Sequence, residues 1–220
     1  MKRRREMEKR SELRAAIEEL SMLAKVQPGD SLDAAHIPTK PFLHVCTLIL
    51  QVLDKIGPTM AVLRQDIHQN IQRLEILCET DPTKYSNLIE MLKKEGSEGN
   101  ARKGTSCSRA FLWLTRSMDF MVALLQRLVK DPGQNMEQAV EESYNITLKP
   151  CHGWISSAAF KVGLKLVPDN KTFISLLMTK DQNYDNLKED MQTLISLLVP
   201  ILEDIHSILR FYRLDRLKST

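Results

Sequence analysis

The stretch from Ser106 to Lys130 is apolar on nearly every side, and it constrains the fold of this chain more than any other feature. Its apolar side chains are Phe111, Leu112, Leu114, Met118, Met121, Val122, Leu124, Leu125 and Leu128. They recur at steps of one, three and four residues, which covers most of the circumference of an α-helix. A helix with so little polar surface must be enclosed by other elements. The sequence therefore predicts a buried central helix with further helices packed around it.

The rest of the chain shows helical periodicity as well. Helices are predicted at residues 1–26, 37–56, 61–78, 136–148, 150–168, 173–180 and 184–217, with a short one after Cys78 capped by Thr80 or Asp81. The first of these mixes acidic and basic residues and is predicted to be a solvated helix. Only 8 glycines and 9 prolines interrupt 220 residues. The predicted class is all-α, in a chain long enough to bury a sizeable core.

Charge and composition exclude several classes of protein. A formal net charge of +3 is too small to indicate a nucleic-acid partner, and basic residues do not alternate with aromatic ones. The charge does permit weak attraction to an anionic membrane surface. No apolar run reaches the roughly 18 residues of a membrane span, and no secretory signal follows the charged N-terminus. We therefore expect a soluble, cytosolic protein.

The cysteines and histidines give no sign of a metal site. Cys46, Cys78, Cys107 and Cys151 are far apart and lack the Cys-x-x-Cys spacing of metal and redox sites. In a cytosolic protein such cysteines are expected to be reduced thiols. The sequence thus predicts neither a metal nor another cofactor.

The predicted helix from Ala61 to Cys78 carries a row of polar residues beside its apolar face. That face consists of Leu63, Ile67, Ile71, Leu74 and Cys78. Asp66, Asn70 and Arg73 follow one another at i, i+4 and i+7 along its edge. A carboxylate, an amide and a guanidinium in line can accept and donate hydrogen bonds to a polar ligand. The alternative is a surface ion pair that contributes only tenths of a kcal/mol, and this helix alone does not decide between them.

A stripe on the buried helix combines basic and aromatic residues. Arg109, Trp113, Arg116 and Phe120 fall at i, i+4, i+7 and i+11. A lone tryptophan in such a helix is most often a core residue. The stripe by itself therefore does not identify a binding site.

The predicted helix from Pro150 to Pro168 has two different faces. His152 is expected to point inward, where a single imidazole is more often a satisfied core residue than a ligand-binding one. Trp154, Lys161 and Lys165 share the opposite face. An exposed indole beside lysines is typical of a surface that rests in the membrane interface.

Taken in order along the chain, these features resemble the glycolipid transfer protein family, in particular its plant-type members. The matching motifs are DxxxNxxR at 66–73, where the family has lysine in the last place, DPTKY at 81–85, the tryptophan of FLWLTR at 111–116, and HGW at 152–154. Phe160 and Pro168 extend the match, which runs from Ile37 to the C-terminus. Residues 1–30 lie outside it as a basic helix and linker, and residues 31–220 are expected to form one domain.

The resemblance implies a two-layer helical sandwich with a tunnel for lipid chains, and transfer of glycosphingolipids between membranes without a covalent step. It implies that Asp66 accepts from the ceramide amide, and that Asn70 and Arg73 bind sugar hydroxyls. Trp113 would stack on the sugar ring and His152 would donate to the amide carbonyl, roles that suit these side chains. The tunnel would replace the bilayer around the hydrocarbon, where each methylene is worth about 0.8 kcal/mol.

Arg109 bears on the choice of head group. It stands where glycolipid-carrying members have an apolar residue and where the ceramide-1-phosphate branch has the first of two arginines. Trp113 occupies the second of those positions, and neutral Asn70 replaces a lysine of that branch. A buried phosphate would then meet two cations at most, Arg109 and Arg73, and its charge would be poorly compensated. We expect a preference for glucosylceramide, with ceramide-1-phosphate transfer or sphingolipid sensing as the alternative.

Two other functional classes fit the sequence less well than lipid transfer. An enzyme could use Asp66 and His152 as an acid-base pair, but no nucleophile elbow, second carboxylate or metal-ligand spacing accompanies these two residues in the sequence. A scaffold for partner proteins would move no lipid between vesicles. The expected partners are a glycosylceramide and, transiently, membrane surfaces, with the chain a monomer that is peripheral to membranes.

Overall fold

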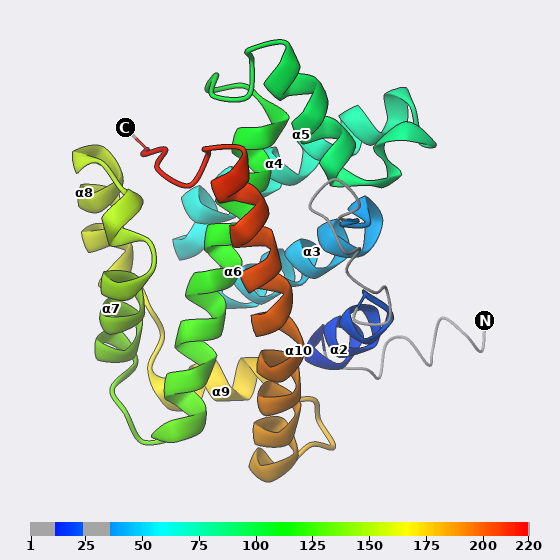
Figure 1. The fold of residues 1–220 in the computed structure, drawn as a ribbon. Helices are drawn as coiled ribbons and strands as arrows, with labels where there is room; N and C mark the ends of the chain where they lie inside the picture. Colours follow the sequence, from blue (N-terminus) through cyan, green and yellow to red (C-terminus); the bar gives the residue numbers. More distant parts are fainter. Residues whose placement is uncertain (1–11, 24–35, 220) are drawn as a thin grey trace.

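The computed structural model describes residues 12–23 and 36–219, which are almost entirely helical (Figure 1). In chain order the helices are α2 (Glu12–Leu23), α3 (Thr39–Ile56), α4 (Ala61–Thr80), α5 (Leu88–Ser97), α6 (Cys107–Lys130), α7 (Met136–Ile146), α8 (Trp154–Leu164), α9 (Asn170–Leu177) and α10 (Tyr184–Phe211). Short 3₁₀ turns lie at Pro58–Met60, Lys84–Ser86 and Lys149–Cys151. No strand occurs within these described ranges, so the predicted all-α class is confirmed.

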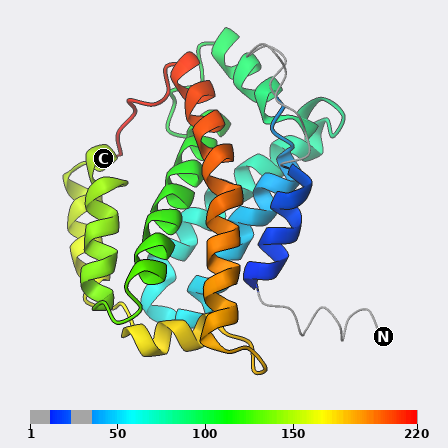
Figure 2. The same cartoon turned by 60° about the horizontal axis from the view of Figure 1, so that its bottom comes forward.

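The helices form two layers with α6 at the centre. α6 and α10 lie side by side, α7 and α8 stand next to them, and α3 and α4 cross behind α6 (Figures 1 and 2). α2 packs against both α3 and α10. This arrangement is the two-layer sandwich that the resemblance implied. None of the helices in the described part of the chain is long and apolar enough to cross a bilayer.

α6 is enclosed as its sequence predicts. Phe111, Leu112 and Leu114 are at most 1% exposed, and complete burial of such a side chain stabilises the fold by about 1.5–3 kcal/mol. The helix begins where Ser106 caps it, because the Ser106 Oγ accepts a hydrogen bond from the backbone nitrogen of Arg109 at 3.0 Å. The rigid enclosure of α6 therefore fixes the positions of the predicted site residues that this helix carries.

The N-terminal helix was predicted to be solvated, and that prediction was wrong for α2. Leu13, Ala16 and Leu20 are buried in the main hydrophobic core. They fall at i, i+3 and i+7, so a narrow apolar stripe lies hidden among many charged residues. The predicted start of this helix and the boundary at residue 30 lie outside the described residues.

Several other predicted helix ends differ from the structure, among them both ends of α9, which was predicted at residues 173–180. α5 is capped by Asn87 rather than by Thr80 or Asp81, because the Asn87 Oδ1 accepts from the backbone nitrogen of Ile89 at 3.1 Å. α8 begins at Trp154, four residues after Pro150, so His152 precedes the helix. α10 ends at Phe211 instead of continuing to residue 217. Residues 212–219, named here the C-terminal tail, are therefore free to cross the surface of the protein.

Candidate functional site

The polar row on α4 is present as predicted, but without the surface ion pair that was the alternative. Asn70 is buried, and its Nδ2 donates to the backbone carbonyl of Asp66, not to the carboxylate, at 3.0 Å. Within the described residues no ion pair joins Asp66 to Arg73. The Asp66 carboxylate and the Asn70 side-chain oxygen accept no hydrogen bond from the described residues, which leaves both able to bind a ligand.

The Asp66 carboxyl has a perturbed environment although the residue lies at the surface. The surrounding protein removes enough water from it to raise its pKa, and the positive charge of Arg73 partly offsets that rise. A carboxylate that is desolvated without a compensating partner weakens the fold. Such an arrangement is typical of a binding group, although structural groups also show it.

Leu63 does not belong to the buried face of α4, which corrects the prediction for that residue. It is 44% exposed, and its neighbour Val62 is 82% exposed, so the described residues leave the first turn of α4 largely uncovered. Ile67, Ile71 and Leu74 are buried as expected.

Arg73 lies close to the beginning of α6. Its Nη1 is 3.5 Å from the carbonyl of Gly104, at the limit of a hydrogen bond. The Sγ of Cys107 is 3.7 Å from the Arg73 carbonyl. The backbone of Arg73 is thus fixed against α6, while its guanidinium is only loosely held and can turn toward a ligand.

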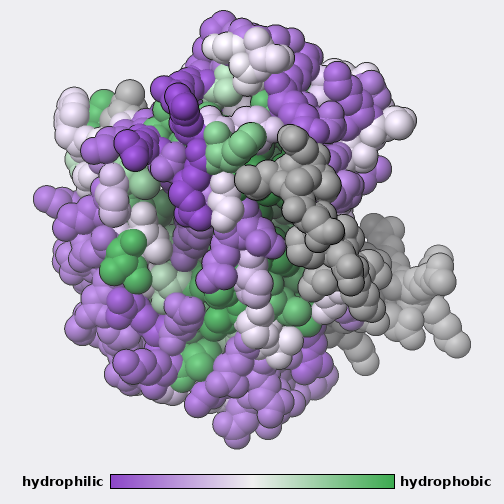
Figure 3. Space-filling view, viewed as in Figure 1, coloured by the Kyte–Doolittle hydropathy of each residue, from purple (hydrophilic) through white to green (hydrophobic). Residues whose placement is uncertain are grey.

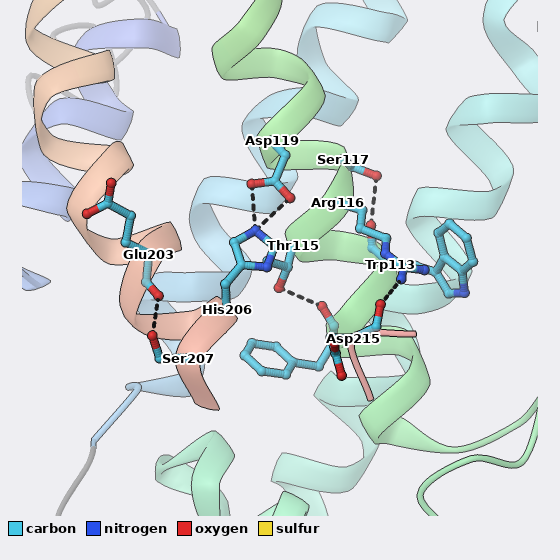
Figure 4. Close-up of polar contacts among 10 residues, drawn as sticks. Trp113, Thr115, Arg116, Ser117, Asp119, Glu203, His206, Ser207 and Asp215 are labelled. Atoms are coloured by element: carbon cyan, nitrogen blue, oxygen red, sulfur yellow. Dashed lines mark hydrogen bonds and ion pairs between the residues drawn. The ribbon is translucent and has the colours of Figure 1, made fainter. Parts of the chain in front are cut away.

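Trp113 is half-buried in a cluster of polar groups and is not a simple core residue. The guanidinium carbon of Arg116 lies 4.6 Å from the centre of its ring (Figure 4). The centre of the His152 imidazole lies 5.8 Å from the centre of the Trp113 ring, and the two ring planes are tilted by 43°. The structure therefore brings together Trp113 and His152, two of the predicted site residues. It adds Arg116, which sequence analysis placed on the stripe but gave no role.

Arg116 joins α6 to the C-terminal tail. The residue is 5% exposed, and its Nη1 and Nη2 each donate at 2.8 Å, to the carbonyls of Leu217 and Asp215. Arg109 makes a similar bond, from its Nη2 to the carbonyl of Lys218 at 2.8 Å. Burial lowers the pKa of Arg116, and these carbonyls compensate the buried charge. Two arginines of the predicted stripe thus hold the tail across this end of the molecule.

The far end of the tail binds the segment that contains His152. The backbone nitrogen of Ser219 donates to the carbonyl of Cys151 at 3.0 Å. Its Oγ is 2.8 Å from the Oγ of Ser156 and accepts from the backbone nitrogen of Gly153 at 3.1 Å. The sequence does not reveal this contact, because its helical pattern of apolar residues continues to residue 217.

His152 is tied to α7 through Tyr144, a second residue that sequence analysis did not single out. The Tyr144 hydroxyl lies 3.3 Å from the His152 Nδ1 and 3.3 Å from the Ser157 Oγ. The Tyr144 hydroxyl has a single proton, so it donates either to Ser157 or, when the Ser157 hydroxyl donates to Tyr144, to Nδ1. In the second arrangement the Nε2 of a neutral His152 carries the proton and can donate to a carbonyl. Burial, together with the charge of Arg116, lowers the pKa of His152, so the neutral imidazole is favoured.

The α4 row and the Trp113 cluster remain separate. No hydrogen bond, ion pair or ring contact among the described residues links Asp66, Asn70 or Arg73 to Trp113 or His152. The packing of α4 along α6 sets the distance between the two groups, but no direct side-chain contact among the described residues joins them. A ligand that touched both would therefore supply the missing connection.

The outer face of α8 has the predicted composition. Trp154 is 80% exposed and Val162 is 66% exposed, and Lys161 is exposed beside them. Lys165 is exposed too, but it forms an ion pair with Glu137 of α7. As predicted, His152 points inward and Trp154 outward. Within the described residues, the four cysteines are free and no cluster suited to a metal ion occurs.

Comparison with known proteins gives consistent matches. The family model described as glycolipid transfer protein matches residues 37–179. Glycolipid transfer protein 3 of Arabidopsis thaliana is 58% identical over 232 aligned positions, which cover 100% of both chains.

Solved structures share the fold. One, described as showing how FAPP2 selects simple glycosphingolipids using the GLTP fold, aligns with a TM-score of 0.76 and 25% identity over 88% of this chain and 93% of that one. A mutant of Arabidopsis ACD11 in complex with ceramide-1-phosphate aligns with a TM-score of 0.81 and 19% identity over 93% of this chain and 97% of that one. At that identity the second likeness concerns the fold alone.

Proposed function

Because the chain belongs to the glycolipid transfer protein family, whose members are lipid transfer proteins and not enzymes, we propose that it moves glycosphingolipids between membranes and prefers glucosylceramide. The preference for a sugar head group is supported by the relatives, which are named as glycolipid transfer proteins, and by the FAPP2 structure. We propose further that the protein acts as a cytosolic monomer that touches membranes only transiently.

The observation that carries this proposal is the placement of Trp113. The guanidinium of Arg116 lies 4.6 Å from the centre of its indole ring, and the centre of the His152 ring lies 5.8 Å from it. An aromatic ring fixed in this way is preorganised to stack on the C–H face of a sugar. The α4 row would then bind the hydroxyls and the amide, with Asp66 as acceptor and with Asn70 and Arg73 as its partners.

The state of the arginines favours a neutral head group over a phosphate. From the sequence, a bound phosphate was expected to meet two cations at most, Arg109 and Arg73. The structure adds Arg116 to this end of the molecule, and this third cation makes ceramide-1-phosphate the second candidate ligand. However, both Nη atoms of Arg116 and the Nη2 of Arg109 already donate to carbonyls of the tail. These bonds take up part of the donor set of both arginines and fix their direction, whereas a sugar requires no buried charge to be neutralised.

The membrane contact would be made by the outer face of α8. Trp154 and Val162 can enter the interfacial region, where indoles are favoured. Lys161 can approach anionic head groups directly, whereas Lys165 is already paired with Glu137. Of the two lysines, we therefore expect Lys161 to contribute more to docking.

The proposal is tested by a vesicle assay with three labelled lipids. We expect rapid transfer of glucosylceramide, slower transfer of galactosylceramide and little transfer of ceramide-1-phosphate. The Arg109→Leu variant should transfer a wider range of sugars, because the guanidinium and its bond to Lys218 restrict the space beside Trp113. Transfer of ceramide-1-phosphate as fast as glucosylceramide would overturn the head-group assignment.

A further inference from the structure

A group of arginines surrounds a hollow at the end of α10. The hollow has a volume of about 550 Å³ and is lined by Arg102, Arg210, Arg213, Asp215, Arg216 and Leu217. Arg102 reaches it from the loop before α6, while the others belong to α10 and the tail. Figure 3 shows strongly hydrophilic side chains over this end of α10 and the tail. Four guanidiniums and one carboxylate give this hollow, named here the arginine hollow, a formal charge of +3.

The positive charge is not neutralised by the described part of the chain. Arg102 donates to the carbonyl of Arg213 at 3.1 Å, and Arg210 donates to the Oγ of Ser207 at 2.9 Å, so both bind uncharged acceptors. Among the described residues that line the hollow, one carries a carboxylate, Asp215, and it is 4.0 Å from the Nε of Arg216. Guanidiniums gathered in this way repel one another, and a bound anion would relieve that repulsion.

Arg213 occupies a backbone conformation that rarely carries a side chain. Its φ is +56°. The backbone nitrogen of Leu214 bonds to the carbonyl of Leu209, and that of Arg213 to the carbonyl of Arg210, both at 2.9 Å. In this helix ending the left-handed position is usually glycine. Basic residues are favoured in the last turn of a helix, and Arg210 lies there in α10. This preference does not explain the other arginines of the hollow, since Arg213 and Arg216 follow the helix and Arg102 comes from another segment.

We propose that the arginine hollow binds the phosphate-monoester head group of an anionic membrane lipid, which is not the lipid that the protein transfers. Guanidiniums bind phosphate oxygens through paired hydrogen bonds, and several converging ones suit a group with two negative charges. The inference deepens the proposed function, since it rests on the protein docking to membranes.

Two observations favour a membrane lipid as the source of the phosphate. Phe211, beside the hollow in sequence, is 56% exposed and can enter the interface. The tail runs from Arg213 to Ser219, which contacts the segment before α8. Six residues span at most about 20 Å, so the arginine hollow and the exposed face of Trp154 can touch one membrane together.

The test measures binding to vesicles that contain no glycolipid. Phosphatidylcholine vesicles receive either phosphatidic acid or phosphatidylserine at matched surface charge, and bound protein is measured by sedimentation. The double variant Arg213→Gly/Arg216→Gln should bind the phosphatidic acid vesicles about 30-fold more weakly, since each basic residue near the surface contributes about tenfold or less. Glycine suits the φ of +56° at residue 213, so the fold should not suffer.

A matched control removes the same charge far from the hollow. Lys171 and Lys180 are exposed near the two ends of α9, and Lys171→Gln/Lys180→Gln should weaken binding less than about threefold. An equal loss in this control would overturn the proposal, because it would show attraction by overall charge. Equal binding of the wild type to phosphatidylserine vesicles would also overturn it.

Two further arms separate the possible explanations. If soluble glycerol 3-phosphate displaces the protein from the vesicles at concentrations comparable with the accessible phosphatidic acid, the ligand is a free phosphate and the membrane assignment is wrong. Asp66→Val should bind these vesicles as the wild type does. A wild-type protein that binds them selectively but transfers no glycolipid would contradict the proposed function while supporting the arginine hollow.

Discussion

The two parts of the candidate site are built in different ways. The α4 row comes from one helix, where each side chain is placed by its own turn and the described residues supply few partners. The Trp113 cluster gathers groups from α6, α7, the segment before α8 and the tail, and nearly every polar group in it is bonded to another segment. Substitutions in the row should therefore affect the fold little, whereas substitutions in the cluster should also weaken contacts that hold the fold together.

The largest expected effect comes from removing the residue that joins the cluster to the tail. In Arg116→Met we expect a loss of about 2–3 kcal/mol in unfolding free energy, because two bonds from a buried charged donor disappear. Transfer should fall by at least about tenfold, since Trp113 also loses a partner. Urea unfolding and a vesicle transfer assay would measure both.

A suitable control is Arg64→Met, which breaks an exposed ion pair with Asp54. It should change stability far less than Arg116→Met does, as expected for a surface pair. If Arg116→Met were no more damaging than this control, the distinction between cluster and row would fail.

Asp66→Val should have the opposite profile, losing transfer while keeping stability. The folded protein raises the pKa of this carboxyl, so its charged form is disfavoured by folding. Loss of the charge should therefore leave the melting temperature unchanged or raise it near pH 7. Transfer of glucosylceramide should fall by about tenfold or more, because a buried amide would lose its acceptor. Asp204→Val, at an exposed position on α10, should retain transfer; comparable loss in both variants would argue against the row as a ligand site.

The Trp154→Ala variant tests whether the outer face of α8 acts only in docking to the membrane. The side chain is 80% exposed, so its removal should hardly affect stability. We expect binding to neutral vesicles to weaken by about tenfold, in line with the transfer energy of a large apolar side chain. In a Trp113→Phe background, the fluorescence of Trp154 should shift to the blue when vesicles are added. An unshifted spectrum would show that this face does not enter the membrane.

The smallest effect concerns the protonation of His152. Folding lowers the pKa of His152, so the unfolded chain protonates this residue more readily than the folded protein does. The free energy of unfolding therefore decreases as the pH falls below about 6.5, the usual pKa of histidine. The loss is complete once pH is below the folded pKa. Melting curves between pH 7.5 and 5.5, an interval around the usual histidine pKa of about 6.5, should depend less on pH in His152→Gln than in the wild type. His36→Gln, at an exposed position, should not flatten the profile; if it did so equally, His152 would not be the responsible group.

Helical periodicity was sufficient to predict the class of the fold and the central helix. The side chains of α6 repeat their pattern over many turns, and burial of that pattern leaves few alternatives to helices packed around it. The spacing of Asp66, Asn70 and Arg73 was equally readable, because residues on one helix are related by its geometry alone. The exposed position of Trp154 followed from the same rule.

Periodicity could not reveal the parts that depend on contacts between distant segments. Arg116 and Leu217 are 101 residues apart in sequence, yet the guanidinium of one binds the carbonyl of the other. Every residue has a backbone carbonyl, so the sequence does not indicate which carbonyl accepts a hydrogen bond from Arg116. The sequence also does not show where α10 ends, because apolar residues continue past Phe211. Likewise, the apolar stripe of α2 became a core element only because α3 and α10 present surfaces to cover it. Local geometry thus determined which residues share a helix face, and tertiary packing decided which of those faces and carbonyls meet.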